Sequence, residues 1–165
     1  MGGCCSSPGS SARLKNKFFA IPDRFQSLPQ VQDALRRAGL DSAGLIFAVD
    51  FTASNSGTGE RSFGGKNLHH LELDGQGRTD TERLNPYQEV IRICSITLEH
   101  ILPTREIAVF GFGDKSTKDH SVFSFKPGNQ RCQDLDEVLE RYVDVVQSVN
   151  IFGPTSFGPA IRAAM

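Results

Sequence analysis

A short apolar segment followed directly by acidic and hydroxyl residues constrains this 165-residue chain more than any other feature. Residues 45–49 (Leu-Ile-Phe-Ala-Val) are continuously apolar, and Asp50-Phe51-Thr52-Ala53-Ser54 follows without a break. Such a short run predicts a strand buried on both faces, at the centre of a parallel sheet. Ligands of open α/β sheets gather outside the carboxyl ends of the strands, so we expect a binding site at Asp50 and the residues after it.

Periodic apolar positions predict further elements around this strand. We expect helices over residues 28–38, 86–101 and 135–149, strands over 107–112 and 122–125, and the opening of another helix at 158–165. The two later strands are separated by a polar stretch, which favours an antiparallel hairpin. The alternation predicts an α/β fold, with a mainly parallel sheet and helices on both faces.

Two helix starts carry the spacing of a capping box, in which the first residue and the residue three positions later bond to each other's backbone. The pairs are Ser27 with Gln30 and Asn85 with Gln88. Adjacent histidines, His69 and His70, lie in the loop between the first strand and the second helix. Neighbouring side chains point apart and no third His or Cys is near in sequence, so we expect one of them to have a structural role.

The residues after the first strand offer hard oxygen ligands. In an extended segment, positions i, i+2 and i+4 turn Asp50, Thr52 and Ser54 toward the same side. One carboxylate and neutral oxygens suit Mg²⁺ or Mn²⁺ and leave room for a carboxylate from outside. The alternative is a capped loop, in which these side chains bond only to nearby backbone N–H groups. A second hydroxyl-bearing loop, 153–157 with Thr155, follows the long helix and supports the metal hypothesis.

Together these motifs resemble the metal-ion-dependent adhesion site of von Willebrand factor A domains, and specifically those of the copine family. The resemblance runs from about Phe18 to Met165. Within the family, the sequence is most similar to plant RING-domain ubiquitin ligases of the RGLG type. It implies a von Willebrand A (Rossmann-like) fold and four metal ligands, which are Asp50, Thr52, Ser54 and Thr155. The family takes a further carboxylate after its fourth strand, so residues 18–165 are expected to be the N-terminal portion of a C-terminally truncated domain.

The first residues carry a lipidation motif. Met1-Gly2-Gly3-Cys4-Cys5-Ser6 matches the pattern for myristoylation of Gly2, and Cys4 or Cys5 would accept the palmitoyl group that stable anchoring needs. We therefore expect residues 1–17 to be a disordered, lipidated leader at the cytoplasmic face of the plasma membrane, with a cytoplasmic or nuclear pool. The alternative is a Gly/Ser/Pro leader that carries the motif by chance.

Charge and cysteine content narrow the function classes. Eighteen Lys and Arg against nineteen Asp and Glu give no large positive field, which argues against nucleic acid as a partner. The apolar runs are too short to span a bilayer as a helix. Cys94 and Cys132 lack the paired spacing of a zinc-binding RING finger, so no ubiquitin transfer is expected from these residues.

The sequence thus predicts a membrane-tethered, cation-dependent module that binds an acidic residue of a partner protein. The resemblance adds ubiquitin-pathway proteins as partners, with the module as the recognition part of a ubiquitin-ligase-like protein. Two alternatives stay open. One is an E3 ubiquitin ligase, if a RING finger is encoded beyond residue 165. The other is a metal-free scaffold or a non-functional fragment, in which the first strand lacks a neighbour and exposes a hydrogen-bonding edge.

Overall fold

The computed structural model describes residues 24–98 and 100–165. The expected leader lies outside these residues, and with it the three lipidation sites Gly2, Cys4 and Cys5. Within the described residues, no helix combines the length and the apolar character needed to cross a membrane.

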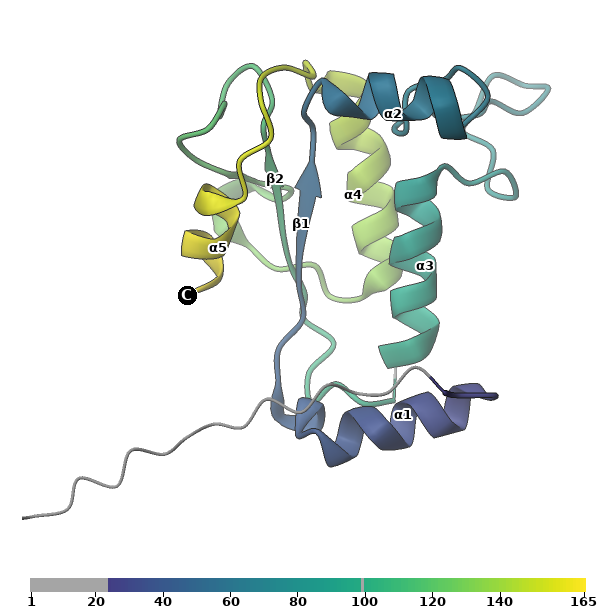
Figure 1. The fold of residues 1–165 in the computed structure, drawn as a ribbon, viewed down its shortest axis with the longest axis vertical. Coiled ribbons are helices and arrows are strands. Elements are labelled where there is room, and N and C mark those ends of the chain that lie inside the picture. The colour runs from purple at the N-terminus through teal and green to yellow at the C-terminus, as the bar shows by residue number, and fades with distance from the viewer. Residues whose placement is uncertain (1–23, 99) are drawn as a thin grey trace, which may run out of the picture.

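The chain forms helices and strands in alternation (Figure 1). The α-helices are α1 (Leu28–Arg37), α2 (Ser54–Ser62), α3 (Pro86–Leu98), α4 (Leu135–Ser148) and α5 (Gly158–Ala164). The strands are β1 (Ile46–Asp50), β2 (Ala108–Phe112) and β3 (Phe123–Ser124), and two 3₁₀ turns are η1 (Leu40–Ser42) and η2 (Pro127–Asn129). The predicted α/β class is confirmed.

The strands form one sheet in the order β1-β2-β3. β1 and β2 run parallel, with Asp50 opposite Phe112, and β3 pairs antiparallel with β2 as the hairpin prediction requires. Figure 1 shows α3 and α4 side by side along the strands and α5 on the other side. The carboxyl ends of β1 and β2 therefore meet at the edge of the sheet where α2 begins.

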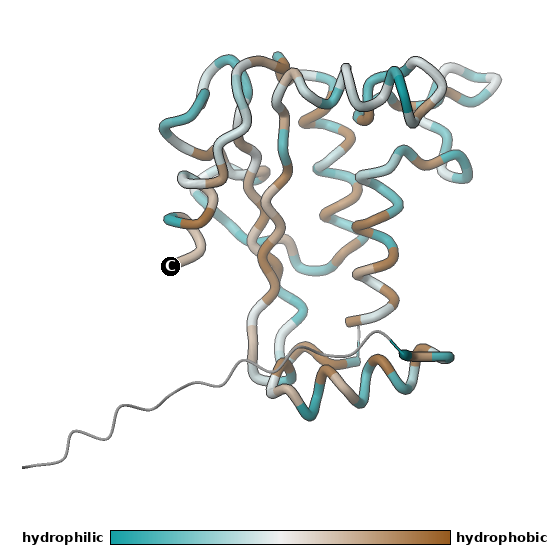
Figure 2. The backbone as a smooth tube through the Cα atoms, viewed as in Figure 1, coloured by the Kyte–Doolittle hydropathy of each residue, from teal (hydrophilic) through white to brown (hydrophobic). Residues whose placement is uncertain are grey.

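The main core lies between one face of the sheet and the helices α3 and α4. Val49 of β1 and Val109 of β2 pack there against Ile91 of α3 and the fully buried Val138 and Tyr142 of α4. Figure 2 shows hydrophobic stretches along both strands and on the sides of these two helices. Because alternate strand residues point to opposite faces, this core fixes the direction in which every side chain of β1 points.

The expectation that the first strand is buried on both faces is wrong. Val49 is only 4% exposed on the core face, but Ile46 on the opposite face is 41% exposed. The reason is that α5 contacts β2 and leaves this part of β1 uncovered. Among the described residues β1 also pairs with a strand on one side only, so it is an edge strand and not the centre of the sheet.

The two predicted capping boxes have different outcomes. Around Asn85 the box is complete, since the backbone N–H of Asn85 donates to Gln88 Oε1 at 3.0 Å and that of Gln88 donates to Asn85 Oδ1 at 3.0 Å. The box at Ser27 is wrong. Its side chain makes no capping bond, and Gln30 Oε1 accepts instead from the N–H of Gln26 at 2.8 Å.

Helix α2 was not predicted, because its sequence Ser-Asn-Ser-Gly-Thr-Gly-Glu-Arg-Ser has two glycines and no apolar stripe. Tertiary contacts hold it instead. Asn67 Nδ2 donates to Ser56 Oγ at 2.8 Å, and the N–H of Leu68 donates to the carbonyl of Asn55 at 3.3 Å. The buried Gly59 lies so close to the backbone of Lys66 that a side chain at position 59 would overlap the Lys66 carbonyl.

We expect Gly59→Ala to destabilise the fold, because a Cβ at this position displaces the Lys66 carbonyl. The expected loss is about 1 to 3 kcal/mol in the free energy of unfolding, as for other overpacked sites. Gly57→Ala in the same helix is the matched control, since a Cβ there meets no atom within 4 Å. It should be neutral or stabilising by up to about 1 kcal/mol. Urea denaturation measures both, and equal effects would contradict this packing.

Candidate metal centre

Three hydroxyl groups from two distant parts of the chain meet beyond the end of β1. Thr52 Oγ1 lies 2.8 Å from Ser54 Oγ and 2.8 Å from Thr155 Oγ1, and the latter two are 3.3 Å apart. The carboxylate of Asp50 is next to them, with Oδ1 accepting from the N–H of Thr52 at 2.8 Å. The structure thus brings together all four residues selected from the sequence.

Backbone pairing produces this convergence. Residue 52 forms a parallel bridge with Phe152, in which the N–H of Ala53 donates to the Phe152 carbonyl at 2.8 Å and the N–H of Phe152 donates to the Phe51 carbonyl at 3.3 Å. The loop that carries Thr155 therefore runs directly beside the segment after β1. This backbone pairing sets two segments that are a hundred residues apart in sequence in a fixed position relative to each other.

The predicted local geometry is wrong at Ser54. We expected an extended segment through positions 50, 52 and 54, but Ser54 is the first residue of α2 and Ala53 before it is already helical, with φ −61° and ψ −20°. The turn into the helix, and not strand alternation, brings Ser54 Oγ to Thr52 Oγ1. No sequence pattern predicts this helix, so the expectation that the three side chains converge rests on an incorrect local geometry.

Gly113, in the loop after β2, allows Thr52 to sit where it does. Its φ of 80° is in the left-handed region that favours glycine, and a Cβ there would overlap the methyl group of Thr52. Thr52 itself is fully buried. Gly113 therefore packs against the methyl group of Thr52, and the hydroxyl group of Thr52 faces Ser54 and Thr155.

The spacing of the three hydroxyl oxygens fits a small octahedral cation. An ion bound at about 2.1 Å holds neighbouring ligand oxygens about 3.0 Å apart, so one face of the octahedron is a triangle of that edge. The observed edges of 2.8, 2.8 and 3.3 Å bracket this value. Neutral oxygens and one carboxylate suit Mg²⁺ or Mn²⁺. Over the part of the chain that the structure describes, no group of three or more His, Cys, Asp and Glu offers a competing metal site.

Three polar side chains to which sequence analysis gave no role at the site surround the main-chain carbonyl of Asp50. His69 Nε2 lies 2.7 Å from this oxygen, Asn55 Nδ2 donates to it at 2.9 Å, and Tyr87 Oη lies 3.1 Å away. Asn55 Nδ2 also donates to the carbonyl of Thr52 at 3.0 Å. These contacts fix the backbone on both sides of Phe51. Asn55, His69 and Tyr87 belong to motifs shared with the copine family, but only for the adjacent histidines is a structural role expected, and that expectation is correct for His69.

The imidazole of His69 is enclosed and neutral. It is 3% exposed and is stacked between Phe51 and Tyr87, with ring centroids 4.6 and 4.0 Å apart. Burial lowers the pKa of His69 to about 4, against the opposing effect of its bond to the Asp50 carbonyl. Burial also raises the pKa of Tyr87 to about 12. Both groups therefore stay uncharged near neutral pH.

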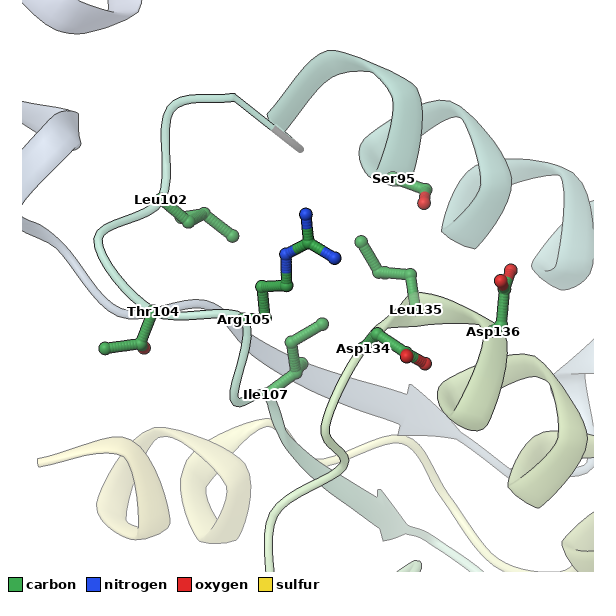
Figure 3. A pocket seen from close by; sticks show the side chains of 8 residues that line it. All are labelled: Ser95, Leu102, Thr104, Arg105, Ile107, Asp134, Leu135 and Asp136. Carbon is green, nitrogen blue, oxygen red and sulfur yellow. The ribbon is translucent and has the colours of Figure 1, made fainter.

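A hollow lies at the end of the strands opposite the hydroxyl cluster, near the start of β2 and α4 (Figure 3). Its lining includes Leu102, Ile107 and Leu135, and the Arg105 guanidinium points into it. Its volume is about 120 Å³. Pockets for drug-sized ligands measure roughly 300 Å³ or more, so this hollow is too small for such a ligand. The hydroxyl cluster is the stronger candidate.

Comparison with known proteins agrees with the resemblance to the copine family. The model of the family described as Copine matches residues 78–165. The chain is 46% identical over 151 residues to E3 ubiquitin-protein ligase RGLG4 of Arabidopsis thaliana. The matched segment covers 92% of this chain and 35% of that protein. With E3 ubiquitin-protein ligase RGLG1 of the same plant it shares 42% identity over 153 residues, covering 93% of this chain and 29% of that protein.

An animal protein is also similar. Copine family protein 1 of Caenorhabditis elegans is 43% identical over 139 residues, covering 84% of this chain and 12% of that protein. The chain therefore spans about a third of the length of the plant relatives and a smaller share of this one.

We expect the enclosed histidine to make stability depend on pH. The unfolded chain binds a proton at His69 below about pH 6.5, whereas the folded chain binds it only near pH 4. The contribution of neutral His69 to the free energy of unfolding is therefore fully present above pH 6.5. It is lost as the pH falls from 6.5 to about 4, by about 3 kcal/mol in all. Urea denaturation at several pH values measures the slope. It should largely disappear in His69→Gln and persist in His70→Gln, and a slope unchanged in His69→Gln would contradict the assignment.

Proposed function

Because the chain belongs to the copine family, we propose that it is a protein-binding module in which a divalent cation holds an acidic residue of the partner. The observation that carries the proposal is the triangle of hydroxyl oxygens beside the Asp50 carboxylate. The fold of the chain is of the von Willebrand A-like α/β type. In such folds the carboxyl ends of the strands are where ligands bind.

The four site residues have different roles. Thr52, Ser54 and Thr155 supply neutral oxygens, and Asp50 supplies the only negative charge of the set, directly or through water. Mg²⁺ or Mn²⁺ bound there would supply a positive centre for an acidic ligand. Since one carboxylate leaves a divalent ion with net positive charge, a carboxylate from a partner's Asp or Glu is the chemistry that complements the site.

The relatives suggest a wider setting. The Arabidopsis proteins bear the name E3 ubiquitin-protein ligase, and they match more than nine-tenths of this chain at 42% identity or more. We infer that the module recognises substrates or partners within a ubiquitin-ligase-like protein. The alternative in which the protein is itself an E3 ubiquitin ligase needs a RING finger encoded beyond residue 165, because Cys94 and Cys132 are not spaced to bind zinc.

One observation favours a second candidate, a metal-free scaffold or a fragment without activity. Among the described residues β1 pairs on one side only, and Ile46 on it is 41% exposed. An open strand edge beside exposed apolar surface favours association with another chain. The two candidates differ in whether the hydroxyl cluster takes up a cation.

The lipidation motif supports attachment to a membrane. Myristate on Gly2 and palmitate on Cys4 or Cys5 would hold the module at the cytoplasmic face of the plasma membrane, where two lipid chains give stable anchoring and one does not. Reversible palmitoylation would leave a pool in the cytoplasm or nucleus.

We expect the chain to bind Mn²⁺ through its hydroxyl cluster. Thr155→Val removes one oxygen at nearly constant volume and should weaken Mn²⁺ binding by about tenfold or more, and Asp50→Ala should weaken it further. Thr58→Val, on the exposed surface of α2, is the matched control and should bind as the wild type does. Titration calorimetry measures the affinities. Identical weak uptake by all four proteins would reject the cation site and favour the scaffold.

Membrane attachment should depend on the second residue of the chain. Gly2→Ala removes the amino group that accepts myristate, so the variant should move from the membrane to the soluble fraction. Gly3→Ala keeps the motif and serves as the control. Fractionation of cells that express each protein measures the partition. Equal membrane fractions for the wild type and Gly2→Ala would exclude lipid anchoring through this motif.

A further inference from the structure

A directed series of hydrogen bonds runs from the first turn of α3 to the carbonyl of Asp50. The carbonyl oxygen can only accept, so His69 Nε2, at 2.7 Å, carries the proton. In the tautomer with its proton on Nε2, the other ring nitrogen, Nδ1, is an acceptor, and it accepts from the hydroxyl of Tyr142 at 2.8 Å. The single proton of Tyr142 goes to this nearer acceptor and not to Asn85 Oδ1, which lies 3.3 Å away, and the Tyr142 oxygen accepts from Asn85 Nδ2 at 3.1 Å.

The series begins at a helix N-terminus. Asn85 Oδ1 accepts from the backbone N–H of Gln88 at 3.0 Å, one of the free donors of the first turn of α3. Asn85 and Tyr142 are both fully buried, so these bonds do not compete with water. Each donor polarises the next in the same direction, and this strengthens hydrogen bonds in series. The last acceptor is the peptide that joins β1 to the candidate centre.

We propose that His69, Tyr142 and Asn85 are positioning residues that hold the Asp50 peptide, and through it the hydroxyl cluster, in the arrangement that accepts a cation. This inference rests on the proposed cation-binding function. None of the three residues belongs to the set of four oxygen ligands. They lie in a loop, on α4 and at the start of α3, and they act through the main chain of residue 50.

The geometry explains how the effect reaches the ligands. Turning the Asp50 carbonyl away from His69 Nε2 rotates the peptide before Phe51, and the N–H of Thr52 follows only two residues later. That N–H is the group that holds the Asp50 carboxylate, at 2.8 Å. Asn55 Nδ2 joins the carbonyls of Asp50 and Thr52, so the two peptides move as a unit. A shift at one carbonyl therefore displaces both Asp50 Oδ1 and Thr52 Oγ1.

Tyr142→Phe is the decisive variant, because it removes one oxygen and keeps the packed ring. It breaks the series between Asn85 and His69, so we expect Mn²⁺ affinity to fall about tenfold, at the low end of the effect of residues that orient metal ligands elsewhere. Val138→Ala is the matched control. Val138 lies one turn earlier on α4, is fully buried and has no part in the series, so its variant loses stability without moving the ligands.

Rescue tests the role of the imidazole. In His69→Gln the side-chain amide can donate to the Asp50 carbonyl and accept from Tyr142, whereas His69→Leu can do neither. We expect His69→Gln to bind Mn²⁺ better than His69→Leu by several-fold. All titrations use the 165-residue chain well below the unfolding temperature of each variant, so that differences in stability do not enter the affinity.

Amide resonances give a readout that needs no metal. In nuclear magnetic resonance spectra without cation, the Thr52 and Ser54 amides should shift in Tyr142→Phe and stay in place in Val138→Ala. If both variants bind Mn²⁺ as the wild type does and these amides do not move, the positioning role is overturned. If the wild type takes up no Mn²⁺ but the amides shift in Tyr142→Phe alone, the cation site fails and the positioning of residues 50–54 stands.

Discussion

The pairing of three backbone segments at one register determines where every oxygen of the candidate centre lies. β1 is parallel to β2 with Asp50 opposite Phe112, and residue 52 is bridged to Phe152. A slip of one residue in either pairing turns each side chain to the opposite face of the sheet. Thr155 would then leave Thr52, and the hydroxyl cluster would not form. The core between the sheet and α4 prevents the slip, because Val49 and Val109 are both buried against it.

The centre also depends on polar groups that are buried behind it. A main-chain carbonyl withdrawn from water needs partners, and Asp50 obtains them from His69 and Asn55. The same bonds that satisfy this oxygen set the direction of the chain into Thr52. Stability and site geometry therefore share a cause, and only variants that keep the packed volume can separate the two.

Sequence patterns predicted the fold class and selected the oxygen-bearing residues that the structure brings together, because both leave local signals. The apolar run before Asp50 and the periodic faces of α3 and α4 depend on nearest neighbours in the chain. Three features left no such signal. Helix α2 is held by contacts with Lys66 and Asn67, which lie outside it. The exposed face of β1 depends on what α5 covers.

The third feature is the environment of His69. Its role requires that Tyr142, far along the chain, be placed against it, and no spacing within a single segment reports that contact. The resemblance to copine proteins linked Thr155 with the residues after β1, because a family pattern carries tertiary information that periodicity lacks. The i, i+2, i+4 argument for Ser54 shows the limit of periodicity, because the residue belongs to a helix.

The hydroxyl groups of Thr52, Ser54 and Thr155 bond to one another, and across the described residues no buried side-chain polar atom lacks a partner. A cation would thus replace existing bonds and would not be needed to offset a buried, unsatisfied group. Zinc fingers differ, since their ligands cannot remain together without the metal. If the chain binds a cation as proposed, its architecture would already be in place before the ion arrives, so the occupancy of the site would follow the local ion concentration without a change of fold.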